Sequence, residues 1–239
     1  MSQWVVKGIR TGIKTTRYPN AMDDAAGVTP GRPLPAKMDV AAADRLIDRC
    51  PTRAIAQSDG QVSIDYNRCI HCYRCARGVK KPLDWQNTYE WATLAGAHSK
   101  FAAPFHRSIH IIVVDAGDCG ACLNEVKQLN SPYYNMHRLG FFITPTPRHA
   151  DVLLLVGPVT DHIRVALLKT YEAMPSPKRV VAVGACALSG GIFAESFVCS
   201  KGLAGVLPVD VEVPGNPPPP LAILHGLLVA VGRKMGAPR

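Results

Sequence analysis

DVLLLVGPVTDHIRVALLKTYEAMPSPKRVVAVG, residues 151–184, contains two short apolar runs separated by a segment of mixed polarity. The runs 151–157 and 179–184 are nearly continuous Val, Leu and Ala, as in strands that are buried on both faces. Between them, residues 161–174 space their apolar side chains with a helical period, and Thr160 or Asp161 is placed to cap that helix. This order predicts two parallel strands joined by a crossover helix.

Segments on either side continue the pattern. Residues 110–115 (HIIVVD) predict another buried strand, which ends in a turn at 116–120. Residues 206–213 predict a fourth strand, and a Pro-rich turn and a final helix, about 219–233, follow it. Strands that alternate with helices predict an α/β domain whose parallel sheet is covered on both faces. Ligands of such sheets bind in the loops beyond the carboxyl ends of the strands.

The remainder of the 239-residue chain differs from this part in composition. Residues 1–40 are rich in Gly, Pro and Thr without a sustained period, and predict an extended arm. Residues 41–82 hold four of the eight cysteines and predict a small module. Residues 83–105 are then a linker, and residues 106–239 form the α/β domain.

Composition and charge exclude several classes of protein. A hydrophobic content of 47% with 19% charged residues excludes a disordered chain. No apolar run reaches the roughly 18 residues of a membrane-spanning helix, and the first residues lack a secretion signal, so we expect a soluble or peripheral protein.

The net charge is +9, of which +6 lies in residues 1–100. No recognition-helix pattern or aromatic-rich stretch accompanies it, so we expect no nucleic-acid partner. A docking surface for an acidic partner or for anionic lipid, and a merely solvated face, remain open. The chain has no glycine-rich phosphate loop and no serine nucleophile motif.

The first group of cysteines is a C-x2-C-x2-C run, preceded by a distant Cys-Pro. The run is Cys69, Cys72 and Cys75, and the upstream cysteine is Cys50 in CPTRAI. Bacterial ferredoxins use this combination to hold a [4Fe–4S] cluster, and residues 50–79 resemble half of such a ferredoxin. A second Cys-Pro is absent, so only one complete set of ligands remains. A zinc site of four thiolates and reduced structural cysteines are the alternatives.

A second group of cysteines lies in the α/β part. Cys119 and Cys122 follow the strand 110–115 as a C-x-x-C pair, and Cys186 follows the strand 179–184. Because the carboxyl ends of parallel strands meet at one edge of a sheet, these cysteines can converge on one face of a second cluster. The C-x-x-C pair also serves thioredoxin-like redox chemistry, but the third cysteine and the order of elements argue against that interpretation.

The segments around these cysteines resemble one protein family. It is the small, cluster-bearing subunit of membrane-bound group 4 [NiFe]-hydrogenases of the formate-hydrogenlyase type, together with the 20-kDa (PSST-type) subunit of respiratory complex I. The resemblance covers roughly residues 107–232, and residues 8–19 resemble the start of the ferredoxin-like subunit of the same complexes. Complex I members carry two adjacent cysteines at the first ligand position, so the C-x-x-C pair resembles the hydrogenase branch. The matching segments are 115–122 (DAGDCGAC), 130–140 (NSPYYNMHRLG), 147–160 (PRHADVLLLVGPVT), 183–193 (VGACALSGGIF) and 208–215 (PVDVEVPG).

The resemblance implies a flavodoxin-like α/β domain with a second [4Fe–4S] cluster, beside the cluster of the ferredoxin-like module. It implies electron transfer to or from a large partner subunit, which resembles the hydrogenase large subunit or the 49-kDa subunit of complex I. Further iron–sulfur and membrane subunits would complete the assembly on the cytoplasmic side of the bacterial inner membrane, with this chain peripheral.

Two alternatives to the hydrogenase interpretation remain. One is a complex I-like, non-hydrogenase ion pump that is driven by redox chemistry and linked to quinone or ferredoxin. The other, from a different functional class, is a zinc-bound basic interaction module.

One ligand position departs from the family pattern. The family's fourth cluster cysteine lies in PGCPPRPE, whereas residues 214–221 read PGNPPPPL and place Asn216 there. A neutral amide is a poor iron ligand beside thiolates. Three interpretations stay open. In the first, Cys119, Cys122, Cys186 and Cys199 bind a [4Fe–4S] cluster. In the second, only Cys119, Cys122 and Cys186 bind the cluster, and its fourth iron is either missing, as in [3Fe–4S], or bound by Asn216 or water. In the third interpretation the cluster has been lost and the fold is kept as a scaffold.

Two further residues near the cysteines have predicted roles. Glu125 lies three residues after Cys122 and would share its face on a helix. In hydrogenase small subunits a glutamate near this position lies close to the catalytic metal site, so the resemblance implies proton transfer for Glu125; a solvated helix glutamate is the alternative. His71, inside the ferredoxin-like run, is expected to be an exposed neighbour of the first cluster; tuning of the reduction potential through a hydrogen bond is the alternative.

Overall fold

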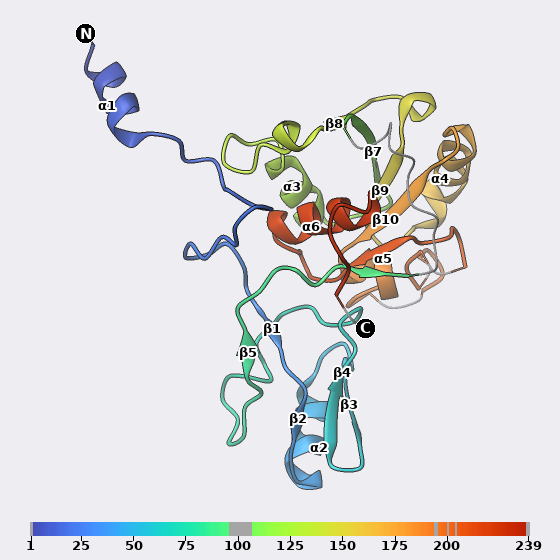
Figure 1. Ribbon diagram of the computed structural model, residues 1–239. Helices are drawn as coiled ribbons and strands as arrows, with labels where there is room; N and C mark the ends of the chain where they lie inside the picture. The colour runs from blue at the N-terminus through green and yellow to red at the C-terminus, as the bar shows by residue number, and fades with distance from the viewer. Residues whose placement is uncertain (1, 96–106, 194–195, 200, 204, 238–239) are drawn as a thin grey trace.

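The computed structural model describes residues 2–95, 107–193, 196–199, 201–203 and 205–237 (Figure 1). Its centre is a six-stranded sheet in which five neighbouring strands are parallel and one edge strand is antiparallel. The predicted parallel sheet is therefore confirmed. In spatial order the strands are β6 (Thr93–Leu94), β11 (Val211–Val213), β10 (Arg179–Val183), β9 (Val152–Val156), β7 (Ile109–Asp115) and β8 (Phe141–Ile143).

The order of the five parallel strands is that of doubly wound sheets of the flavodoxin type. Among the five parallel strands, β7 comes first in the sequence. Strand β8 pairs with one side of it, and β9, β10 and β11 follow in order on the other side. The direction of winding reverses between β7 and β9. The loops after these two strands meet at the carboxyl edge, where the Thr160 N–H donates to the Ala116 carbonyl at 3.0 Å. Ligands of such sheets bind at this edge.

Helices cover both faces of the sheet, as the sequence predicts (Figure 1). On one face, α6 (Pro220–Ala230) and α3 (Ala121–Gln128) pack on side chains such as Leu154 and Val181. On the other face, α4 (Asp161–Ala173) and α5 (Ala185–Ser189) pack on the alternate residues of the same strands. Every residue of α6 is buried, which explains why its sequence is apolar all round.

The packing of α6 on β11 depends on a glycine. A Cβ on Gly226 would lie 2.3 Å from Cγ2 of Val213, a stiff β-branched side chain that cannot move aside. We expect Gly226→Ala to lower the free energy of unfolding by about 1–3 kcal/mol, because overpacking outweighs the gain in helix propensity. Chemical denaturation of both proteins measures this. Gly8→Ala is the control, since nothing lies within 4 Å of that position; a stabilised Gly226→Ala protein would contradict the prediction.

Some predicted boundaries of the α/β domain were wrong. The strand predicted over 206–213 is confined to β11, because residues 206–209 form a turn and irregular chain. The last helix is α6, shorter than the predicted 219–233. The short strands β6 and β8 were not predicted, since two or three residues carry no periodic signal.

A smaller module is built from the first part of the chain. The strands β2 (Ala36–Lys37), β4 (Gln61–Ile64) and β3 (Ile55–Ser58) form an antiparallel sheet, against which α2 (Val40–Arg49) packs. Strand β1 (Arg32–Pro33) pairs with β5 (Trp85–Gln86). The sheets of this module thus use residues on both sides of the predicted range 41–82.

The sequence predicts an extended arm over the first 40 residues, but part of this segment is helical. Residues of α1 (Gln3–Thr11) form a helix without a buried side chain, which projects from the body of the protein (Figure 1). The prediction failed because nine residues are too few for a sustained period. The chain joins the α/β domain at Thr16, whose N–H donates to the Tyr133 carbonyl at 2.9 Å, and at the fully buried Tyr18.

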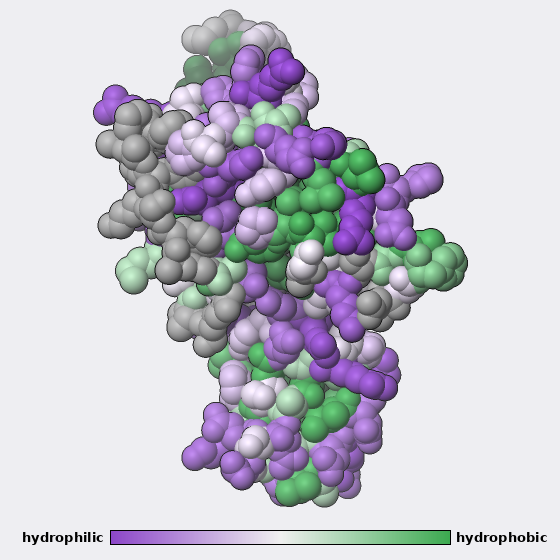
Figure 2. Space-filling model, turned by 90° about the vertical axis from the view of Figure 1, so that its right-hand side faces the viewer, coloured by the Kyte–Doolittle hydropathy of each residue, from purple (hydrophilic) through white to green (hydrophobic). Residues whose placement is uncertain are grey.

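Much of the predicted linker, residues 96–105, lies outside the described residues. Among those described, no helix is long and apolar enough to cross a membrane. On the face shown in Figure 2, a hydrophobic patch lies on the α/β domain. The N-terminal module lies below this patch, and many of the residues at the edges of the module are hydrophilic.

Candidate iron–sulfur sites

The cysteines of the first group lie on two turns that face each other in the N-terminal module. Cys50 ends α2, whose N-terminus is capped by the Asp39 carboxylate at 3.1 Å from the Ala42 nitrogen. The other three cysteines lie on the loop after β4, where His71 and Tyr73 have positive φ angles of 51° and 60°. Left-handed residues between ordinary ones curl a loop and turn its N–H groups inward, an arrangement seen at iron–sulfur sites.

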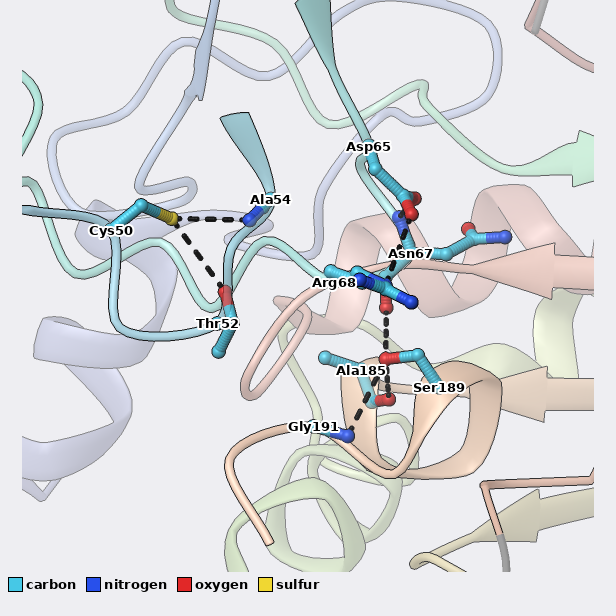
Figure 3. Close-up of polar contacts among 9 residues, drawn as sticks. All are labelled: Cys50, Thr52, Ala54, Asp65, Asn67, Arg68, Ala185, Ser189 and Gly191. Carbon is cyan, nitrogen blue, oxygen red and sulfur yellow. Dashed lines mark hydrogen bonds and ion pairs between the residues drawn. The ribbon is translucent and has the colours of Figure 1, made fainter. Parts of the chain in front are cut away.

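All four cysteines line a single cavity. Its other walls are mainly apolar, and they include Leu46, Ile55, Ile64 and Trp85. The Cys50 sulfur also accepts a hydrogen bond from the Ala54 N–H at 3.2 Å (Figure 3). Cys72 is exposed, whereas the other three cysteines are half-buried. The predicted ligands of the first site are thus brought together.

The electrostatics of this cavity disfavour bare thiolates. Burial, together with the smaller effect of negative charge on the other three cysteines, raises the pKa of Cys69 to about 12. Burial also raises the pKa of Cys75, and the indole of Trp85 lines the same cavity. The indole N–H is buried without a partner among the described atoms that meets hydrogen-bond geometry. Four convergent sulfurs with a spare N–H donor beside them fit an iron–sulfur cluster, whose iron holds thiolates deprotonated and whose sulfurs accept hydrogen bonds.

The expectation that His71 is exposed was wrong. Its ring is half-buried and makes edge contacts with Trp91 and Trp85, with centroids 5.1 and 6.1 Å apart. Burial lowers the pKa of His71 to about 4, so the imidazole is neutral at pH 7. The two tryptophans come from beyond the cysteine run, so the motif alone did not reveal them.

The cysteines of the second group gather at the carboxyl edge of the large sheet. Cys119 is exposed on the loop after β7, and Cys122 is buried on α3. Cys186 is buried on α5, directly after β10. The Asp118 carboxylate shapes the first of these loops, since it accepts the N–H groups of Gly120 and Leu123, both at 3.0 Å.

Two glycines let the sulfurs approach the backbone. A Cβ on Gly184 would lie 2.6 Å from Sγ of Cys122, and a Cβ on Gly191 would lie 2.8 Å from Sγ of Cys186. Both glycines have positive φ angles, of 90° and 57°. They are therefore part of the site, and sequence reasoning missed them because their role depends on contacts between distant loops.

The eighth cysteine, Cys199, lies beside this group. It is 8% exposed and forms an isolated bridge with Thr160, which follows β9. Thr160 in turn contacts Gly117, because a Cβ there would be 2.5 Å from the Thr160 methyl. Burial raises the pKa of Cys186 to about 11, and charge on Cys119, Asp118 and Cys199 adds to the effect.

Asn216, at the family's fourth ligand position, approaches the group from another side. The carbonyl of the preceding Gly215 accepts the Ala185 N–H at 2.7 Å. The same carbonyl lies 3.4 Å from the position of a Cβ on Gly184, whose neighbour is Cys122. The backbone before Asn216 thus contacts the segments that carry Cys122 and Cys186, and the charge of Cys199 acts on Cys186.

Glu125 lies on α3, where burial raises its pKa. Its charge contributes to the raised pKa of Cys122, after the larger effects of burial and Asp118. The side chain of Glu125 is half-buried. In the described part of the chain, no three His, Cys, Asp or Glu side chains lie close enough together to hold a single metal ion.

Comparison with known proteins identifies the family. The family model of the NADH ubiquinone oxidoreductase 20-kDa subunit matches residues 119–230. The probable membrane-bound hydrogenase subunit mbhJ of Pyrococcus furiosus is 42% identical over 125 residues, which are 52% of this chain and 75% of that protein. The chain belongs to this family. The predicted recognition is confirmed, and family members typically bind a [4Fe–4S] cluster.

Other members of the family are subunits of oxidoreductases of both predicted kinds. A subunit of the NADH-quinone oxidoreductase of Carboxydothermus hydrogenoformans is 42% identical over 119 residues, which are 49% of this chain and 71% of that protein. Formate hydrogenlyase subunit 7 of Escherichia coli is 35% identical over 159 residues, which are 66% of this chain and 60% of that protein. The family match begins at Cys119, so the N-terminal module lies outside it.

Proposed function

We propose that this chain is the electron-transfer subunit of a multi-subunit oxidoreductase related to formate-hydrogenlyase-type hydrogenases. The observation that carries the proposal is the convergence of cysteines at two places, one in each folded part of the chain. When bound at these places, [4Fe–4S] clusters supply one-electron transfer. The large partner subunit, hydrogenase-like or like the 49-kDa subunit of complex I, would hold the active site.

The residues of the first site have distinct tasks in this proposal. Cys50, Cys69, Cys72 and Cys75 bind the cluster. Leu46, Ile55 and Ile64 exclude water from it, and a dry surround with N–H donors to sulfur sets the reduction potential. Trp85 would supply such a donor. Because Cys72 is exposed, that edge of the site is open to a redox partner.

In the second site, Cys119, Cys122 and Cys186 bind the cluster, and Cys199 supplies the fourth thiolate in place of Asn216. A thiolate is the better iron ligand, because it is charged and soft. The arrangement at the winding reversal of the sheet supports this assignment, since Cys199 is held there through Thr160. Proton transfer by Glu125 stays a prediction.

The C-x-x-C pair favours the hydrogenase branch, and a complex I-like pump without hydrogenase activity is the second candidate. In both cases we propose a peripheral position on the cytoplasmic side of the bacterial inner membrane, beside further iron–sulfur and membrane subunits. The paired C-x-x-C motifs of the large partner, which bind nickel in hydrogenases, would distinguish the two.

Iron and acid-labile sulfide, measured on the complex prepared without oxygen, test the proposal. We expect about eight irons and eight sulfides per copy of this chain, in excess of those of the other subunits. A content of about four irons per chain would mean that only one site holds a cluster. Zinc in place of iron would overturn the proposal altogether.

A further inference from the structure

Ser189, on α5 of the α/β domain, contacts the N-terminal module through its side chain (Figure 3). The Ser189 hydroxyl donates to the carbonyl oxygen of Asn67 at 2.9 Å. Asn67 lies two residues before Cys69, and Ser189 lies three residues after Cys186. A single hydrogen bond therefore connects the loop of one site with the helix of the other.

The same hydroxyl is linked to the Cys186 sulfur by a second contact. The N–H of Gly191 lies 3.4 Å from the Ser189 oxygen and donates to it. The α-carbon of Gly191 packs on Cys186, because a Cβ there would be 2.8 Å from Sγ. The Ser189 oxygen is also 3.0 Å from the Ala185 carbonyl, so its proton is shared between that carbonyl and Asn67.

The surroundings of Ser189 are positively charged. A cavity of about 280 Å³ opens beside it, lined by residues that follow or precede the cysteines of both sites. Its cationic residues are Arg53, Arg68 and Lys201, of which Arg68 forms an ion pair with Asp65 at 3.4 Å. Positive charge between two redox sites stabilises an added electron on either of them. The junction is thus suited electrostatically to the passage of negative charge.

We propose that Ser189 is the positioning residue that couples the two cysteine sites. Its hydroxyl holds the Cys69 loop against the Cys186 helix and bridges the gap between them by hydrogen bonds. With clusters bound at both sites, one electron would pass from the reduced cluster to the oxidised one, with no bond broken and no proton moved. This inference rests on the proposed function, because it requires a cluster at both sites.

Substitutions at Ser189 separate the hydroxyl from the shape of the side chain. Ser189→Ala removes the hydroxyl, so the Asn67 carbonyl and the Gly191 N–H lose their hydrogen bonds to it, and a gap opens between them. Ser189→Thr keeps the hydroxyl, whereas Ser189→Val has nearly the shape of threonine without it. Ser63→Ala is the matched control, since it removes another bond from a serine hydroxyl to a backbone carbonyl, 3.4 Å from Ala56, inside the N-terminal module.

The rate of electron redistribution between the two sites tests the inference. In the assembled complex, one site is reduced by a light pulse, and the spectra of both clusters are followed by freeze-quench electron paramagnetic resonance. We expect a several-fold slower redistribution in Ser189→Ala and Ser189→Val, and a nearly unchanged rate in Ser189→Thr and Ser63→Ala. The iron content and the spectrum of each cluster should be the same in all variants.

Two outcomes would overturn the inference, and only one of them would also overturn the proposed function. An unchanged rate in Ser189→Val, with full iron content, would overturn the role of Ser189 and leave the proposed function intact. About four irons in the wild-type chain would overturn both, since only one site would hold a cluster.

Discussion

Replacing Cys199 with serine should lower the iron content from about eight to about seven per chain and convert one cluster to a three-iron form. Serine is a weaker ligand than thiolate for a cluster iron, and the remaining cysteines hold only three of the corners. Iron analysis and the magnetic resonance signal of an oxidised three-iron cluster measure the change. Because ligand identity sets the potential, the second site should also shift in reduction potential.

A second substitution distinguishes a ligand from a merely buried cysteine. Asn216→Cys restores a cysteine at the family's fourth ligand position. Combined with Cys199→Ser, it should bring the iron content back to about eight. Burial alone gives no reason for such rescue, because a cysteine at position 216 does not restore the packing of the side chain lost at position 199. If Cys199→Ser keeps all its iron, Cys199 is not a ligand.

Removing the cluster from the N-terminal module should unfold that module and leave the α/β domain folded. The hydrophobic core cluster of the module contains only five buried residues, which are Ala43, Leu46, Ile55, Val62 and Leu83. A core of this size rarely stabilises a fold by more than about 3–5 kcal/mol, so small domains depend on metals or disulfides. Here the free energy of cluster binding is folding free energy, because four ligands from two turns meet only in the folded state.

Limited proteolysis of the Cys69→Ala protein, with mass spectrometry of the fragments, tests this dependence. We expect cleavage within residues 32–86 and protection of the segments that form the large sheet. Cys119→Ala is the matched control, since the two apolar cores that flank that sheet remain without it. Protection of residues 32–86 in the Cys69→Ala protein would show that the five-residue core suffices.

Features with a local signal could be predicted from the sequence. The strands β7, β9 and β10 and the helix α4 were predicted within a few residues, because each is long enough to show its period. The four cysteines that line the first cavity were predicted to lie together from the C-x2-C-x2-C spacing, the distant Cys-Pro and the resemblance to a ferredoxin. The convergence of Cys119, Cys122 and Cys186 was predicted by a general rule, that the carboxyl ends of parallel strands share an edge.

Contacts between distant segments could not be predicted in this way. Only the folded chain brings Cys199 to Thr160, and only it reveals Gly184 and Gly191 as the surfaces on which two sulfurs pack. The bond from Ser189 to Asn67 joins residues that are 122 positions apart. A hydrophobic period or a motif depends only on residues that are close together in the sequence. These contacts instead result from how the sheet, its covering helices and the small module pack together, and that packing is a property of the whole chain.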